Sequence, residues 1–418
     1  MRRLLAVTVV VAASLAALSI GYAAQSQQAP QGQSSGQSAA PAVETAGQSK
    51  HFKNIQVLKD IPADQLIASM QFISAALGRD CSFCHVTGEH NDFASDDKPN
   101  KKTAREMMTM TMGINQNSFA GQQRVTCATC HAGHNQPNPA TPIADEARIQ
   151  EMADLRARQA QQRQQQQASQ GQPGGSAAQQ PGSGRPSPQA MQAAADEVVT
   201  KFVQAIGGDA AIQKLTSSQE KGSISAENGQ SAQFEIERQA PNKVLFVSTM
   251  ANGQSARVVC NGSEAAVTTG QGTQPIHGIE LDALKLDANF YRNLNLKAQY
   301  TRMQSSPFPQ KIDGKEVKVV QGILPNNQGR ETLYFDPQSG LLVRRTTLLR
   351  TALGPIAQQT DYSDYREVNG VKIPFSVRVA RADVIQTRKV TEAKFNVPVT
   401  DSTFAVPAPA SGAPSGGK

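Results

Sequence analysis

Tryptophan is absent from the 418-residue chain, and aromatic residues make up only 5% of it. Charged residues are also scarce, at 18%, whereas glutamine, serine, glycine and proline crowd two stretches. Segments of that composition bury too little apolar surface to offset the entropy lost on ordering. We therefore predict that parts of the chain are tethers and that two or three folded units share the rest.

A polybasic block is also missing. The net charge is +7, but the lysines and arginines are spread through the chain. A groove or patch that binds nucleic acid needs basic residues gathered on one element. We therefore do not expect a nucleic-acid partner.

A long apolar run occurs only at the N-terminus. Met1–Arg3 is short and basic, an apolar run extends from Leu4 to about Ile20, and small residues follow at Ala23 and Ala24. This order is typical of a secretory signal, so we predict a signal peptide over residues 1–24 and an exported, periplasmic protein that is soluble or membrane-associated. An uncleaved membrane anchor is the alternative, since about 20 weakly polar residues can span a bilayer.

Cysteine is limited to five residues, and four of them lie in two Cys-x-x-Cys-His motifs. In such a motif each thiol can add to one vinyl group of a porphyrin, and the adjacent histidine can bind the iron. We therefore predict two covalently bound haem c groups. The attachment residues are Cys81, Cys84, Cys127 and Cys130, and the iron ligands are His85 and His131.

Two other kinds of site use pairs of cysteines. A zinc site built from two pairs usually separates them by about 15 to 20 residues, whereas 42 residues lie between Cys84 and Cys127. A thioredoxin-like redox pair needs a strand followed by a helix and no adjacent histidine. Both alternatives are less favoured than haem.

The sixth iron ligand is predicted to be methionine in both sites. Met70 lies 11 residues before Cys81 on a helix expected from about Pro62 to Ile73 and ended by Gly78. Met107 lies 20 residues before Cys127 on a second helix, expected over 103–115. Methionine sulfur raises the haem potential and leaves no open position, which favours electron transfer. The alternatives to Met107 on the same helix are Met108, Met110 and Met112.

The region that carries both motifs resembles the cytochrome c subunit of photosynthetic reaction centres. The similarity lies in the segments 53–58, 70–78, 81–85, 104–107, 114–115 and 125–131. It implies helices with methionine ligands at Met70 and Met107, each followed by a haem-binding turn, and electron transfer as the function. The chain departs from that family in having two motifs where the full subunit binds four haems. The loop 117–126 also lacks the histidine that the family uses for one haem.

The composition divides the chain into successive regions. We predict a multidomain α+β protein in which a small, mainly α dihaem domain is joined by a disordered linker to an antiparallel β half-barrel with a leading helix. The expected regions are a signal peptide at 1–24, a disordered leader at 25–50, the dihaem domain at 51–140, a charged and glutamine-rich linker at 141–189, the half-barrel at 190–407 and a disordered tail at 408–418.

The second unit shows the alternation of short strands. A helix is expected at about 191–206, ended by Gly207 and Gly208. Period-two runs then follow, separated by turn pairs such as Asn261-Gly262 and Asn369-Gly370. The segments 332–336, 340–344 and 362–374 are similar to exported half-barrels of the outer-membrane lipoprotein carrier type. That similarity implies a curved sheet that binds an apolar ligand or docks a partner.

Three functions stay open at this point. The first is a dihaem electron carrier, not an enzyme, whose redox partner is a membrane-bound reaction centre or a respiratory complex. The second is a haem peroxidase, which needs an iron with an open sixth position. The third is a lipid-carrier protein with the cytochrome as an accessory. The sequence shows no nucleophile–base pair, metal cluster or phosphate loop in the second unit, where Cys260 is expected to be a buried, inert thiol.

Overall fold

The computed structural model describes residues 44–87, 91–137 and 186–407, apart from 228, 271, 309, 326–328 and 382–383. The predicted signal peptide, most of the predicted leader and of the linker at 141–189, and the C-terminal tail lie outside these residues. Within them, no helix combines the length and the apolar character needed to cross a bilayer.

The cytochrome-like region is built from short helices. Helix α2 ends at Gly78, whose positive φ of 61° and backbone bonds to Ser74 and Ala75 form the left-handed cap expected from the sequence. Helix α3 extends further in both directions than the predicted 103–115, because Pro99 occupies its first turn and nothing breaks it before Ala120. The helices are α2 (Gln65–Leu77), the 3-10 turn η1 (Cys81–Phe83), α3 (Pro99–Phe119) and α4 (Cys127–His131).

The end of the predicted leader is packed into this region. Thr45 forms an isolated bridge with Pro62, and the Ala46 amide donates to the Ile61 carbonyl. Ala46 is fully buried in a cluster with Leu58 and Leu66. The folded part therefore includes residues before the predicted boundary at 51, because small residues there fit between neighbouring segments.

The second region is one antiparallel sheet of fourteen strands. Its order is β6-β5-β4-β3-β2-β1-β14-β13-β12-β11-β10-β9-β7, with β8 paired to β9. Almost every strand therefore pairs with the strand next to it in sequence, and the first strand, β1, also pairs with the last, β14. The strands are β1 (Ser217–Ala226), β2 (Ser231–Gln239), β3 (Lys243–Met250), β4 (Ser255–Cys260), β5 (Ala265–Thr269), β6 (Gly272–Ile276), β7 (Arg302–Ser305), β8 (Gln310–Ile312), β9 (Lys315–Ile323), β10 (Arg330–Phe335), β11 (Leu342–Arg350), β12 (Pro355–Val368), β13 (Val371–Ala380) and β14 (Ile385–Phe395).

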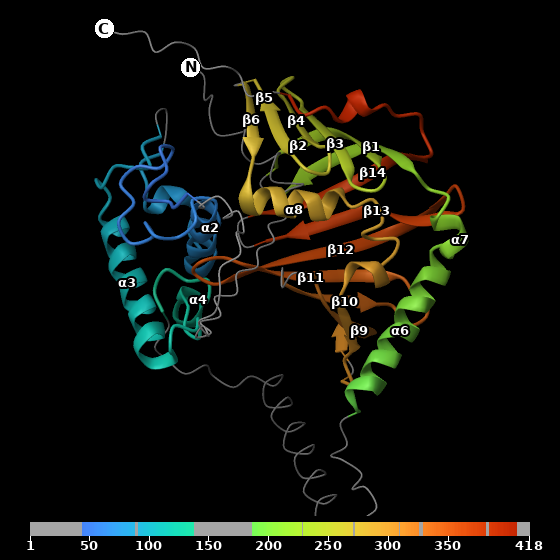
Figure 1. The fold of residues 1–418 in the computed structure, drawn as a ribbon, viewed down its shortest axis with the longest axis horizontal. Helices are drawn as coiled ribbons and strands as arrows, with labels where there is room; N and C mark the ends of the chain where they lie inside the picture. The colour runs from blue at the N-terminus through green and yellow to red at the C-terminus, as the bar shows by residue number, and fades with distance from the viewer. Residues whose placement is uncertain are drawn as a thin grey trace, which may run out of the picture.

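Helices lie against this sheet. The leading helix α6 (Pro188–Ala205) begins where the Ser187 hydroxyl accepts the Ala190 amide, and α7 (Asp209–Ile212) follows it. A further helix, α8 (Gly278–Ala288), lies between β6 and β7 and was not predicted, because its apolar residues do not gather on one stripe. Figure 1 shows α2, α3 and α4 on one side of the strands and α6 on the other.

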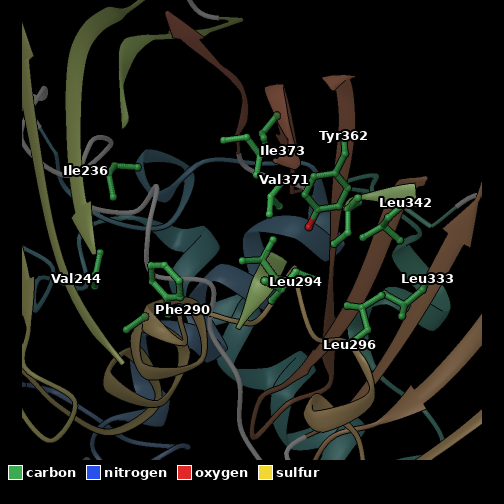
Figure 2. Packing of buried hydrophobic residues seen from close by; sticks show 14 of the residues in the cluster. Ile236, Val244, Phe290, Leu294, Leu296, Leu333, Leu342, Tyr362, Val371 and Ile373 are labelled. Carbon is green, nitrogen blue, oxygen red and sulfur yellow. The ribbon is translucent and has the colours of Figure 1, made fainter. Parts of the chain in front are cut away.

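Side chains from the segment after α8 pack against the buried face of the sheet. Phe290, Leu294 and Leu296 follow α8 and are 7%, 7% and 0% exposed. Figure 2 shows them between strand residues such as Ile236 on one side and Leu333 on the other. The α+β architecture predicted from the sequence is thus confirmed, with an interior occupied by side chains.

The two regions touch through the hairpin between β11 and β12. Phe72 of α2 is 2% exposed and packs with Ile356, and Leu353 contacts the same cluster. Gly354, with φ of +153°, leaves no space for a side chain, since a Cβ would lie 2.6 Å from Phe72 Cζ. Gln123 Nε2 also donates to the Ala352 carbonyl. The hairpin tip is therefore a packed contact with the cytochrome-like region.

Candidate haem centre

The first motif follows directly on α2. Gly78 and the turn after it deliver Cys81 into η1, so that Cys81, Cys84 and His85 lie within one short bend. Cys81 is exposed and Cys84 is half-buried. Burial raises the pKa of Cys84, partly offset by the nearby Lys98 ammonium.

The His85 ring is held by one hydrogen bond. Its Nδ1 lies 3.0 Å from the Phe93 carbonyl oxygen, which can only accept, so Nδ1 carries the proton and Nε2 is left for a metal. The Phe93 ring packs edge-on against the imidazole at 5.4 Å. Burial lowers the pKa of His85, while the Phe93 carbonyl raises it and nearby cations lower it further.

A cavity of about 110 Å³ brings the predicted ligands together. Cys81, Cys84, His85 and Met70 all line it, with apolar neighbours such as Met108. Thiols for covalent attachment, an imidazole and a thioether are the donor set of a methionine-ligated haem c. The residues present therefore fit that cofactor at the first motif.

The second motif forms α4. The Thr126 and Thr129 side chains cap this short helix reciprocally, and His131 lies in its last turn. His131 Nδ1 is 3.0 Å from the His134 carbonyl oxygen, so its Nε2 is also left for a metal. Cys130 is exposed, whereas Cys127 is half-buried beside Phe72.

The two haem-binding turns contact each other through backbone. The Gly133 amide donates to the Ala76 carbonyl at 2.9 Å. A Cβ on Gly78 would lie 2.1 Å from the Gly133 oxygen, so only glycine permits this approach. The sequence spacing of the motifs did not reveal that contact.

The four methionines of α3 have different surroundings. Met108 is 7% exposed and packs in the cluster that contains Met70. Met107, Met110 and Met112 are 37%, 48% and 44% exposed. The assignment of Met107 as ligand to the second haem, against these alternatives, stays a prediction.

A zinc site shared by the two cysteine pairs finds no support in this geometry. Across the described residues, no group of three or more histidine, cysteine or acidic side chains is arranged to hold a metal ion. In the β region, Cys260 is fully buried, as expected, and burial raises its pKa.

Three polar residues position the motifs through hydrogen bonds, and this role was not predicted from the sequence. At the start of α3, Lys98 Nζ donates to the Ser82 carbonyl and Asn100 Nδ2 to the Phe83 carbonyl at 3.2 Å. Near its end, the buried Asn115 donates to the Val125 carbonyl and accepts the Arg124 and Val125 amides at 3.0 and 2.9 Å. Asn115 belongs to the segment 114–115 of the family resemblance, whereas the only sequence signal of Lys98 and Asn100 was proximity to the first motif.

Two attachment motifs with oriented histidines, one beside a methionine-lined cavity, form the arrangement that a c-type haem site requires. The family model for the photosynthetic reaction centre cytochrome C subunit matches residues 16–173. The resemblance predicted from the sequence is thereby confirmed over this part of the chain.

Curated relatives also match part of the chain. The chain is 37% identical over 91 residues to cytochrome c-554 of Chloroflexus aurantiacus, covering 20% of this chain and 21% of the relative. It is 31% identical over 106 residues to the photosynthetic reaction center cytochrome c subunit of Thermochromatium tepidum, covering 24% and 26%. The chain thus spans about a quarter of the length of the curated relatives it matches.

Solved structures are similar to about half of the chain. A LolA superfamily protein from Nitrosomonas europaea is 13% identical with a TM-score of 0.34, covering 50% of this chain and 97% of that one. A DUF1329 family protein from Desulfovibrio piger is 11% identical with a TM-score of 0.38, covering 51% and 97%. The strand order described above defines the architecture of the β region.

Proposed function

We propose that this protein is an exported dihaem c-type cytochrome that carries electrons. The observation that supports it most directly is the cavity in which Cys81, Cys84, His85 and Met70 meet. The haem, when bound, supplies a one-electron couple. The chain's own residues attach it, orient His85 through the Phe93 carbonyl and provide an apolar wall.

The second motif supports a second haem on the same grounds. Its histidine is oriented by a carbonyl, as in the first motif. The backbone contact between the two turns supports two haem sites that lie next to each other. Two adjacent sites of this kind suit transfer of electrons through the protein better than chemistry on a substrate.

The haem content tests this proposal. The protein produced in a bacterial host with a haem c maturation system is expected to retain two haems per chain after denaturation. Cys84→Ala with Cys81→Ala should remove one haem, and the matching pair at Cys127 and Cys130 should remove the other. A chain that carries no covalent haem would refute the proposal.

Absorption spectra separate the electron carrier from a peroxidase. Two methionine-ligated ferric haems give a weak long-wavelength band and leave no open iron position. We expect that band, reversible one-electron titration of each haem and no turnover of hydrogen peroxide. A high-spin haem with peroxide turnover would favour the enzyme instead.

The partner is proposed to be a membrane-bound redox protein, with a reaction centre favoured by the relatives' names and a respiratory complex as the alternative. The test uses isolated purple-bacterial reaction centres stripped of their own cytochrome subunit. Re-reduction of the flash-oxidised donor that accelerates with the concentration of this cytochrome would support the reaction centre. If adding the cytochrome leaves the rate unchanged, a respiratory complex remains as the proposed partner.

The β region is proposed to be a docking scaffold. Phe290, Leu294 and Leu296 fill its interior, which argues against the carriage of an apolar ligand. Lipid extracted in stoichiometric amounts from the purified protein would overturn this part of the proposal.

A further inference from the structure

Lys101 is a buried lysine whose ammonium organises a loop beside the first motif. The residue is 8% exposed, although it lies on the outer helix α3. Its Nζ donates to three successive carbonyls, those of Phe93, Ala94 and Ser95, at 3.0, 2.9 and 2.7 Å. An ammonium has three N–H donors, and these carbonyls together with the Asp96 carboxylate, 3.1 Å away, share that full donor capacity.

The loop that Lys101 holds is the one that orients the axial histidine. The Phe93 carbonyl oxygen accepts from both Lys101 Nζ and His85 Nδ1, each at 3.0 Å. Two donors on one oxygen compete, because the ammonium draws electron density away from the second hydrogen bond. The bond from His85 is thus weaker than one to a carbonyl without a cationic partner.

The strength of that bond controls how well the imidazole donates to iron. A strong acceptor on Nδ1 gives the ring imidazolate character and makes it a better ligand for the ferric state. A weakened acceptor has the opposite effect. The positive charge of Lys101 also disfavours the extra positive charge of ferric iron, so both effects favour the ferrous state.

Other charged groups around His85 do not cancel this effect. Asp96 is 3.1 Å from Lys101 Nζ and 3.0 Å from Arg105 Nη1, and it is half-exposed. Lys98 lies on the same side and donates to the Ser82 carbonyl. The charges that act on the His85 imidazole are those of Lys101, Arg105 and Lys98. The nearby carboxylates are engaged elsewhere: Asp92 accepts the Ala94 and Ser95 amides, and Asp80 accepts the Ser82 hydroxyl.

The second motif lacks this arrangement. The acceptor for His131 is the His134 carbonyl, three residues along the same turn. Within the described part of the chain, no lysine side chain is seen donating to that carbonyl. The carbonyl that accepts from His85 therefore also accepts from a lysine, whereas no such lysine is described for the carbonyl that accepts from His131.

We propose that Lys101 is a positioning residue that weakens the hydrogen bond of His85 to Phe93 and so raises the reduction potential of the first haem above that of the second. This inference rests on the proposed function, because it requires both haems to be bound.

The test is potentiometric titration of the full-length dihaem protein and its variants. Lys101→Met is expected to shift the ferric-to-ferrous ratio of one haem about tenfold toward ferric, which is about 59 mV for a one-electron couple, and to leave the other unchanged. Lys101→Arg, which keeps the charge and the donors, should restore most of the difference. Lys102→Met removes the same charge from an exposed neighbour and should shift either haem by less than about twofold.

Two measurements keep the test decisive. In Cys84→Ser or Cys127→Ser, one haem keeps a vinyl group and absorbs at longer wavelength, so its titration can be followed separately. The proton resonance of His85 Nδ1–H in the ferrous protein should move in Lys101→Met toward that of a stronger hydrogen bond. If Lys101→Met does not fold, the order of the two potentials in the unaltered protein is the test. A first haem with the higher potential supports the proposal, and the reverse order refutes it.

The outcomes separate the two proposals. A chain without redox-active haem refutes the proposed function. Two haems whose potentials do not respond to Lys101→Met, respond equally to Lys102→Met, or have the second haem higher, refute only the role of Lys101.

Discussion

The contact between the hairpin and the cytochrome region can be tested by a double-mutant cycle at Phe72 and Gly354. Phe72→Ala removes a side chain that is 2% exposed, and a buried Phe→Ala change costs about 3 to 5 kcal/mol. Gly354→Ala adds a Cβ that would lie 2.6 Å from Phe72 Cζ, and overpacking of this kind costs about 1 to 3 kcal/mol.

In the double variant the space left by Phe72 accommodates the new Cβ. The two costs should therefore not add, and we expect a coupling of about 1 to 2 kcal/mol in favour of the double variant. Guanidinium unfolding followed by haem absorbance and by far-ultraviolet circular dichroism measures both regions. Coincidence of the two signals checks that a single transition is being compared.

A matched control measures the cost of the strained backbone conformation by itself. Gly272 also has a positive φ, of 115°, but a Cβ there meets nothing within 4 Å. Gly272→Ala should show the strain of a left-handed residue alone and no coupling to Phe72→Ala. If the energies at Phe72 and Gly354 add within about 0.5 kcal/mol, the two side chains do not touch and the docking of the hairpin is wrong.

Three further predictions concern stability. Glu331 is fully buried and lies 2.7 Å from Arg292 Nη2, so Glu331→Gln should cost about 3 to 5 kcal/mol. Burial alone would raise the pKa of Glu331, but Arg292 and Arg345 lower it to about 2. The carboxylate therefore contributes stability that is complete above its ordinary pKa of 4.5 and is lost as the pH falls toward 2, and urea midpoints should fall more steeply over that window in the wild type than in the variant. Asn115→Ala leaves the loop before the second motif without its partners and should lower the unfolding free energy of the haem region by about 1 to 3 kcal/mol, an effect that Asn117→Ala on the exposed surface should not share. Gly78→Ala should lower the thermal midpoint clearly more than Gly133→Ala, because only the first meets backbone; equal shifts would contradict the close approach of the two turns.

Local patterns predicted much of the secondary structure. Gly78 and Gly207 follow helices α2 and α6 as expected, since a glycine after an apolar periodic run is a specific signal. The period-two runs predicted after the leading helix correspond to strands, and in β10 Leu333 and Phe335 are buried between half-exposed neighbours. The motif residues needed no structure, because their spacing is set by the chemistry of haem attachment.

Long-range contacts could not be predicted in the same way. Helix α8 has no single apolar stripe, since its apolar residues contact both the sheet and the segment after it. Lys101 resembled a surface lysine in sequence, and only the fold of loop 93–96 gives it three carbonyls. The packing of Gly354 on Phe72 joins residues that are far apart in the chain.

The backbone contact between the haem-binding turns has a consequence for kinetics. The Gly133 amide bonds to Ala76, and Gly78 leaves no side chain between the turns. Two cofactors attached to such turns would be separated by a fixed distance, because neither turn can shift without breaking the backbone hydrogen bond between them. Electron exchange between them should then be insensitive to solvent viscosity and to whichever protein is bound outside, so that only the exchange with that outside protein would depend on an encounter.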